Sequence, residues 1–319
     1  MKKVLLLIPY NSSFYPPIKK TFRELGYQVR TYDYRKGELA IRVVRFTPLI
    51  GKKIASDLIK KRIKALSDKF KPEIVLTVKG ETLSKGLIES IKKPNNKVVN
   101  WFPDPLNTWD LMVEIAPYYD YFLHFDPLIV KKLRTIGYKN TFYLPFAAEI
   151  TKDQSHSGKI YDISFVGTYS KDREKKLSYL TNFDLNIWGD PRWFTSSLRQ
   201  FTKGGRISQN AMKKIIEKSK ININIHHNLS KKGANLRTFE VTGACGFLLS
   251  DYMEDIMNLY AINKELVCYR TAEELQSKAK YFLTHDLLRK KIAARGYKKA
   301  KEKHNYKNRM EQLVNLINK

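Results

Sequence analysis

Polar and charged residues between positions 235 and 251 form the part of the sequence best suited to bind a ligand. Asn235 to Thr238 stand at the predicted start of a helix, with Arg237 among them. A helix N-terminus attracts anions through its free N–H groups and its dipole. Glu240 follows within one turn, and an ionised glutamate accepts two hydrogen bonds, as a ribose diol requires. An anion cradle beside a diol acceptor predicts a nucleotide site.

The elements that position these residues follow from the same stretch. The helix carrying Glu240 is expected to end before Gly246, and the apolar residues 247–249 then form a short buried strand ending at Ser250 and Asp251. Taken alone, Glu240 has a second interpretation, as a surface or helix-capping carboxylate without a ligand.

The segment from Arg237 to Glu240, with residues 243–251 after it, resembles the donor-site segment of the CgeB-like (spore-maturation-type) glycosyltransferases. That family is related to the group 1 glycosyltransferases, which have the GT-B fold. The resemblance implies that Glu240 binds the ribose of a sugar nucleotide. Relatives often carry a second acidic residue eight positions earlier, where this sequence has Lys232. The residues that contact the sugar are therefore left unassigned.

Length and composition predict a globular protein of two domains. The chain has 319 residues, 43% of them hydrophobic, and domains hold about 150 residues each. It has no apolar run of about 18 residues, and residues 1–8 are typical of a first strand rather than a secretion signal. Cys245 and Cys268 lack metal-ligand spacing, which favours a reducing compartment. We expect a cytoplasmic protein, or one peripheral at the inner membrane face.

The charge is strongly positive. There are 59 basic and 31 acidic residues, a net charge of +28. Such an excess favours a polyanionic partner, whether nucleic acid, an anionic membrane surface or an acidic glycan. Residues 285–309 concentrate it on one predicted helical face. The alternative is that many lysines reflect an AT-rich genome and only solvate the surface.

The first half of the chain predicts a parallel α/β domain. Residues 3–8, 18–25 and 27–32 form a βαβ opening without a Gly-x-Gly-x-x-Gly motif, so a dinucleotide cofactor is not expected here. A helix at 54–70 and a second one at 127–135 alternate with further strands. These strands are predicted at 73–78, 97–102, 120–126 and 141–144.

Four polar residues at strand ends of this half are candidates for a site. Asp104 lies between two prolines after a strand, where a rigid loop suits a base or an acceptor contact. The CgeB-like proteins carry a similar cluster, although Asp104 also fits a simple turn. Glu81 is expected to cap the next helix. His124 and Asp126 share one face of a strand, either at a cleft or as a satisfied core pair.

Two turns of the second half carry further candidates. Residues 151–159 are expected to link the domains, and the strand 161–168 contains Gly167 near its end. The resemblance implies that Gly167 and Arg173 lie at the donor diphosphate and that Gly189, after the strand 183–188, borders the base. The wider superfamily has two cations near the first turn. Here one of those positions is Thr168.

The alternating strand 220–227 ends in a pair of histidines ahead of Arg237. Adjacent strand residues point to opposite faces, so His226 and His227 are not expected to share a metal ion. His226 is a candidate catalytic residue that contacts phosphate or sugar.

These observations predict an α/β protein of the GT-B fold, with two Rossmann-like parallel-sheet domains facing a cleft. The expected parts are an acceptor-side domain at 1–150, a donor domain at 160–300 and a helix at 301–319 that packs back on the first domain. The donor site would comprise Gly167, Arg173, Gly189, Asn235, Arg237, Thr238 and Glu240, with Asp104 and His226 catalytic.

The predicted activity is transfer of a sugar from a nucleotide-diphosphate donor, UDP- or GDP-linked, with retention of configuration and without a metal or cofactor. The acceptor stays open among glycan, lipid-linked, protein and nucleic-acid molecules. The alternatives are a nucleic-acid or polyanion-binding protein on a GT-B scaffold, or a glycosyltransferase that acts on nucleic acid.

Overall fold

The first strand illustrates why the sequence folds into parallel sheets. Strand β1 (Lys3–Leu7) has four consecutive fully buried apolar residues, because a central strand of a parallel sheet is covered on both faces. The computed structural model describes residues 2–39, 41, 51–151 and 158–318. Most of the predicted linker, residues 152–157, lies outside these ranges. The chain divides into two compact units, residues 1–145 with 309–319, and residues 146–308.

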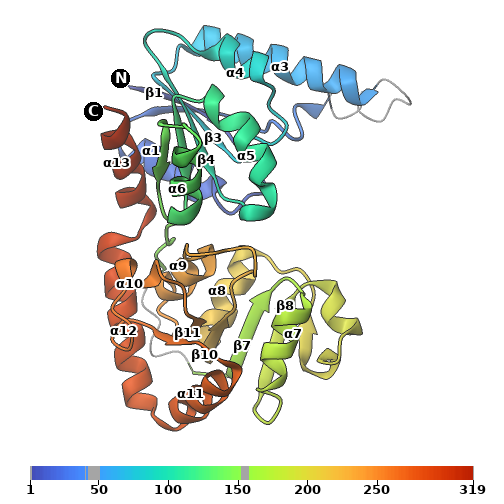
Figure 1. The fold of residues 1–319 in the computed structure, drawn as a ribbon, viewed down its shortest axis with the longest axis vertical. Coiled ribbons are helices and arrows are strands. Elements are labelled where there is room, and N and C mark those ends of the chain that lie inside the picture. Colours follow the sequence, from blue (N-terminus) through green and yellow to red (C-terminus); the bar gives the residue numbers. More distant parts are fainter. Residues whose placement is uncertain (1, 40, 42–50, 152–157, 319) are drawn as a thin grey trace. The chain divides into compact units, whose positions relative to one another are not determined.

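The first unit contains a six-stranded parallel sheet in the order β2-β1-β3-β4-β5-β6. Its helices flank the sheet (Figure 1). The other strands are β2 (Gln28–Tyr32), β3 (Ile74–Val78), β4 (Lys97–Phe102), β5 (Tyr121–His124) and β6 (Thr141–Tyr143). The helices are α1 (Tyr15–Glu24), α3 (Gly51–Phe70), α4 (Lys85–Ile91), α5 (Trp109–Ile115), α6 (Pro127–Thr135) and α13 (Tyr306–Ile317), the last beginning just before the unit boundary.

The second unit repeats this architecture with the strand order β12-β11-β10-β7-β8-β9, again all parallel. Its strands are β7 (Tyr161–Gly167), β8 (Leu185–Gly189), β9 (Thr202–Gly204), β10 (Ser219–Asn224), β11 (Leu248–Asp251) and β12 (Val267–Tyr269). Its helices are α7 (Lys171–Ser178), α8 (Gln209–Lys218), α9 (Leu236–Gly243), α10 (Ile256–Leu259), α11 (Ala272–Thr284) and α12 (Asp286–Lys303). Two Rossmann-like sheets confirm the predicted fold class.

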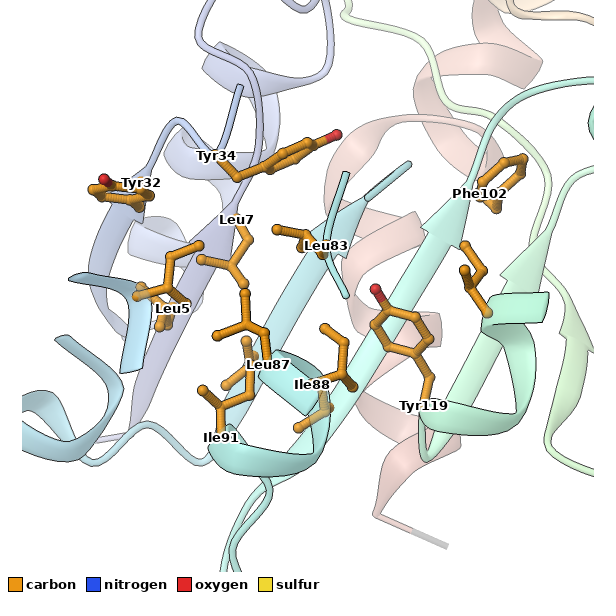
Figure 2. Close-up of a cluster of buried hydrophobic side chains, with 14 of the residues drawn as sticks. Leu5, Leu7, Tyr32, Tyr34, Leu83, Leu87, Ile88, Ile91, Phe102 and Tyr119 are labelled. Carbon is orange, nitrogen blue, oxygen red and sulfur yellow. The ribbon is translucent and has the colours of Figure 1, made fainter. Parts of the chain in front are cut away.

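The core of the first unit forms where helix α4 covers the sheet. Leu5 and Leu7 of β1 lie in one buried cluster with Leu87 and Ile91 of α4, as Figure 2 shows. Burying each such side chain contributes about 1.5–3 kcal/mol relative to exposure. Packing of this face therefore stabilises the sheet of the first unit. The ends of its strands carry the polar candidate residues of the sequence analysis.

Helix α4 also corrects one sequence-based expectation. Ser84, not Glu81, caps it, because the Ser84 side chain accepts a hydrogen bond from Leu87 N. Glu81 instead accepts a hydrogen bond from the Tyr34 hydroxyl at 2.9 Å and pairs with Arg35 at 2.6 Å. Within the described ranges, no helix has the length and apolar character needed to cross a membrane.

Candidate functional site

A pocket of about 480 Å³ lies in the second unit at the carboxyl ends of β7, β8 and β10. Open parallel sheets bind ligands at this edge, where loops and helix N-termini converge. We call it the α9 pocket. Six of the residues predicted from the sequence line it, namely Gly167, Arg173, Gly189, Asn235, Arg237 and Glu240.

Two glycines form one wall of the α9 pocket from bare backbone. Gly167 and Gly189 are register partners on β7 and β8, and a Cβ added at Gly189 would lie 2.7 Å from Gly167 O. Gly189 also has φ +123°, which side chains rarely tolerate. The ring nitrogen of Trp193 donates to Gly167 O at 3.0 Å and fixes this turn. The close approach explains the glycine at 189, and at 167 a Cβ would lie 2.7 Å from the ring of Phe165.

Arg173 is buried next to Gly167, and acceptor oxygens of the protein itself bind its guanidinium. Its Nε and Nη2 donate to Ile225 O at 3.1 and 2.7 Å, and Nη1 donates to Thr168 O and Oγ1 at 2.9 and 2.6 Å. Burial lowers the pKa of the guanidinium, and these acceptors offset the cost of enclosing a charge. Arg173 therefore ties the turn after β7 to the end of β10.

The N-terminus of α9 is held by two asparagines. Asn224 of β10 and Asn235 exchange side-chain hydrogen bonds at 3.0 and 2.9 Å. Asn235 also caps the helix by accepting from Thr238 N at 3.2 Å. Thr238 is fully buried and does not line the pocket; its hydroxyl bonds to the same asparagine pair. These hydrogen bonds hold the N-terminus of α9, the predicted anion-binding segment, in a fixed position.

His226 is buried and also helps to hold the N-terminus of α9. Its side chain has no exposed surface, its Nδ1 lies 2.6 Å from Asp251 Oδ1, and its Nε2 accepts from Asn235 N at 3.0 Å. Since Nε2 accepts, Nδ1 carries the proton and donates to Asp251. Both ring nitrogens are used. His226 therefore cannot contact a substrate as the sequence suggested; it positions Asn235.

Asp251, at the end of β11, completes this chain of contacts. Both carboxylate oxygens also accept from His226 N, at 2.9 and 3.0 Å. Burial is the largest single influence and raises the pKa of Asp251, but the hydrogen bonds and charge of His226 together with the charge of Lys176 outweigh it, and the net pKa lies below its usual value. Asp251, His226 and Asn235 therefore link the sheet edge to the start of α9.

Arg237 and Glu240 face each other across one turn of α9. Arg237 Nη1 donates to Glu240 Oε2 at 2.7 Å, and both side chains are largely but not fully buried, 20% and 15% exposed. Arg237 also contacts the sulfur of Met212 on α8. Glu240 thus offers a carboxylate to the pocket while being held by its own neighbour.

Asp104 belongs to the first unit, where the structure gives it different partners. Its carboxylate pairs with Lys79 Nζ at 2.6 Å, and its backbone oxygen lies 2.9 Å from His124 Nε2. His124 Nδ1 accepts from Asp126 N at 2.9 Å, so the neutral ring is satisfied at both nitrogens. Asp126 caps α6 through Leu128 N. His124 and Asp126 are thus a satisfied core pair that holds the loop of Asp104.

This arrangement predicts a pH dependence of stability. Burial lowers the pKa of His124 to about 4. Between about pH 6.5 and pH 4 the unfolded chain binds a proton that the folded chain does not, so the free energy of unfolding falls as the pH falls, by about 3 kcal/mol in total. Chemical denaturation of the full chain between pH 7 and 4 measures this. His124→Gln should flatten the slope, whereas exposed His285→Gln should leave it unchanged; an unaltered slope in His124→Gln would contradict the assignment.

Several residues of the site were not singled out from the sequence. Arg206 and Met212 line the α9 pocket, and Asn224 and Asp251 support it. The alternation of Asn222 and Asn224 along β10 was a signal for a polar strand face. Among the described residues, no group of three or more His, Cys, Asp or Glu side chains is arranged to hold a metal ion.

The fold resembles solved glycosyltransferase structures along the whole chain. A sucrose-phosphate synthase from Thermosynechococcus elongatus matches with a TM-score of 0.74 and 10% identity, covering 100% of this chain and 98% of the other. Alr3699/HepE from Anabaena, in complex with UDP and glucose, matches at 0.65 and 10%, covering 100% of both chains. The lipopolysaccharide outer core galactosyltransferase WaaB matches at 0.65 and 11%, covering 98% and 99%. These likenesses establish the GT-B fold.

The sequence itself gives a narrower match. No curated protein matches it. Residues 173–315, which include α9 and Glu240, match the family described as Glycosyl transferase-like. The matched region lies within a chain that has the GT-B fold, and it contains most of the residues that line the α9 pocket.

Proposed function

We propose that this protein is a glycosyltransferase that takes its sugar from a nucleoside diphosphate donor, UDP- or GDP-linked, bound in the α9 pocket. The observation that carries the proposal is that Glu240, Arg237 and the start of α9 line one pocket. Alr3699/HepE, which has the same fold, was solved in complex with UDP and with UDP-glucose. The resemblance of residues 237–251 to CgeB-like enzymes supports the same donor class.

In the proposed complex Glu240 accepts hydrogen bonds from the ribose diol, and the diphosphate meets the N-terminus of α9. Among the described residues, the N–H groups of Leu236 and Arg237 have no protein acceptor, so they are able to bind phosphate oxygens. The bond between the sugar C1 and the diphosphate oxygen breaks, and its electrons stay on the leaving diphosphate. The helix end and Arg237 stabilise that charge, for which we invoke no metal.

The acceptor oxygen forms the new bond to C1 and loses its proton. Asp104 is our candidate for the base, because its carboxylate stands in a loop held by the Lys79 ion pair and by His124. Retention of configuration is part of the proposal, as in most of the group that the sequence resembles. Asp104→Asn should lower the transfer rate while UDP affinity stays unchanged.

A thermal-shift panel of UDP, GDP, ADP and TDP, each with Mg²⁺ and with EDTA, tests the donor assignment. A ligand that binds only the folded protein raises the free energy of unfolding, by about 2.7 kcal/mol at a concentration of 100 times Kd, and so raises the midpoint temperature. We expect one nucleotide to raise the midpoint equally with Mg²⁺ and EDTA. No shift with any of the four would contradict the proposal.

A second candidate role, binding of a polyanion, is favoured by a groove on α12. This groove of about 460 Å³ is lined by Lys264, Arg295, Lys298, Lys299 and Lys303, with Glu265 and Glu302 as its acidic members. Steep loss of duplex DNA binding between low and high salt would favour a nucleic-acid partner. Binding to vesicles with anionic lipid, and not to neutral ones, would favour a membrane surface.

A further inference from the structure

Three arginines line the α9 pocket among the residues that the structure describes, and they differ in what they already bind. They are Arg173, Arg206 and Arg237. A nucleoside diphosphate carries several negative charges in its diphosphate, so the number of cations free to meet it matters for affinity. The hydrogen bonds of each guanidinium indicate which arginine is free.

The family resemblance placed Arg173 at the donor diphosphate, but the structure shows that each of its guanidinium nitrogens already donates to the protein. Nε, Nη1 and Nη2 all donate to Thr168 or to Ile225 O, and the residue is only 9% exposed. Turning toward a ligand would leave Ile225 O without this buried partner. Arg173 therefore shapes the pocket without being free to neutralise a ligand.

Arg237 is partly available. Its guanidinium is paired with Glu240 at 2.7 Å, so the two side chains together carry no net charge. Both partners are assigned to the same donor, one to the diphosphate and the other to the ribose. A further cation would therefore add to the attraction that the start of α9 and Arg237 exert on a diphosphate.

Arg206 is exposed, and within the described part of the chain its guanidinium has no hydrogen-bond or ion-pair partner. It follows β9 and two glycines, and it precedes Ser208, which caps α8. Gly189 N donates to Gly205 O at 2.9 Å, which holds the residue before Arg206 against the glycine wall. The backbone of Arg206 is thus anchored at the pocket while its side chain is uncommitted.

We propose that Arg206 is the cation that binds the donor diphosphate in the α9 pocket, in place of the buried Arg173. The inference rests on the proposed donor function. An arginine fork matches the paired oxygens of a diphosphate, whereas a nucleoside without phosphate offers it no such partner. Arg206 therefore adds affinity for the phosphates and not for the nucleoside.

Isothermal titration of UDP, GDP and their nucleosides into the full chain tests this inference. With the nucleotide that binds the wild type, Arg206→Ala should weaken diphosphate affinity about 30-fold and nucleoside affinity less than about twofold. Arg206→Lys should recover part of the loss, because lysine keeps the charge without the fork. Lys203→Ala is the matched control, an exposed cation on β9 that does not line the pocket, and should bind like the wild type.

Equal affinity of Arg206→Ala and the wild type for the diphosphate would overturn the inference and leave the donor proposal standing. An equal loss for nucleoside and diphosphate would also overturn it, since Arg206 would then bind the base or ribose. Absence of binding to the wild type by every nucleoside diphosphate would overturn both.

Discussion

Replacement of Glu240 by alanine is expected to weaken binding of the donor nucleotide by about 10- to 100-fold. Hydrogen bonds to a charged group contribute about 1.5–3 kcal/mol, and the proposed ribose contact is made by this carboxylate. The loss should appear equally for nucleoside and nucleoside diphosphate, because both carry the diol. Titration calorimetry with UDP or GDP and the matching nucleoside measures it.

Folding should change little in this variant, because Glu240 lies at the pocket and, within the described part of the chain, its side chain bonds to a single partner, Arg237. Glu254→Ala is the matched control, since Glu254 pairs with Lys232 at 2.6 Å but does not line the α9 pocket. We expect the control to bind nucleotide normally. Normal nucleotide affinity in Glu240→Ala would remove the carboxylate from the ribose site, whatever the midpoint of unfolding does.

The sequence predicted the elements whose patterns are local. The alternation in β10 and the apolar run in β1 identified both strands, and the small residues after Glu240 identified the end of α9. Strand β9 was missed because Thr202–Gly204 has only three residues and no apolar alternation. It joins the sheet through β8, which only the tertiary fold supplies.

The roles of single site residues depended on partners far along the chain. The sequence suggested His226 as a catalytic residue, but its ring is hydrogen-bonded to Asp251, which lies 25 positions later. Arg173 was expected to bind phosphate, but its guanidinium donates to Ile225 O, which is 52 positions away. No local pattern reports such contacts. Glu240 and Arg237 could be grouped from the sequence because they lie one helical turn apart.

Asp251→Ala is expected to lower the free energy of unfolding by about 3 kcal/mol and to weaken nucleotide binding as well. Removing the carboxylate leaves the buried His226 ring and His226 N without their acceptor. The displaced ring would then no longer accept from Asn235 N, and the start of α9 would lose its fixed position. Denaturant unfolding and titration calorimetry of the full chain measure the two effects.

Asp251→Asn keeps one oxygen acceptor and should recover part of both losses, as expected of a residue that positions others. The pKa of Asp251 is lowered in the folded chain, so its stabilising effect is present above the ordinary pKa of about 3.9 and is lost as the pH falls below it. The stability difference between wild type and Asp251→Asn should therefore shrink in acid. Asp251→Ala could lose stability and still bind nucleotide as tightly as the wild type. That result would mean that the contacts through His226 stabilise the fold without setting the position of α9. The Asn224–Asn235 pair would then be what positions the start of α9.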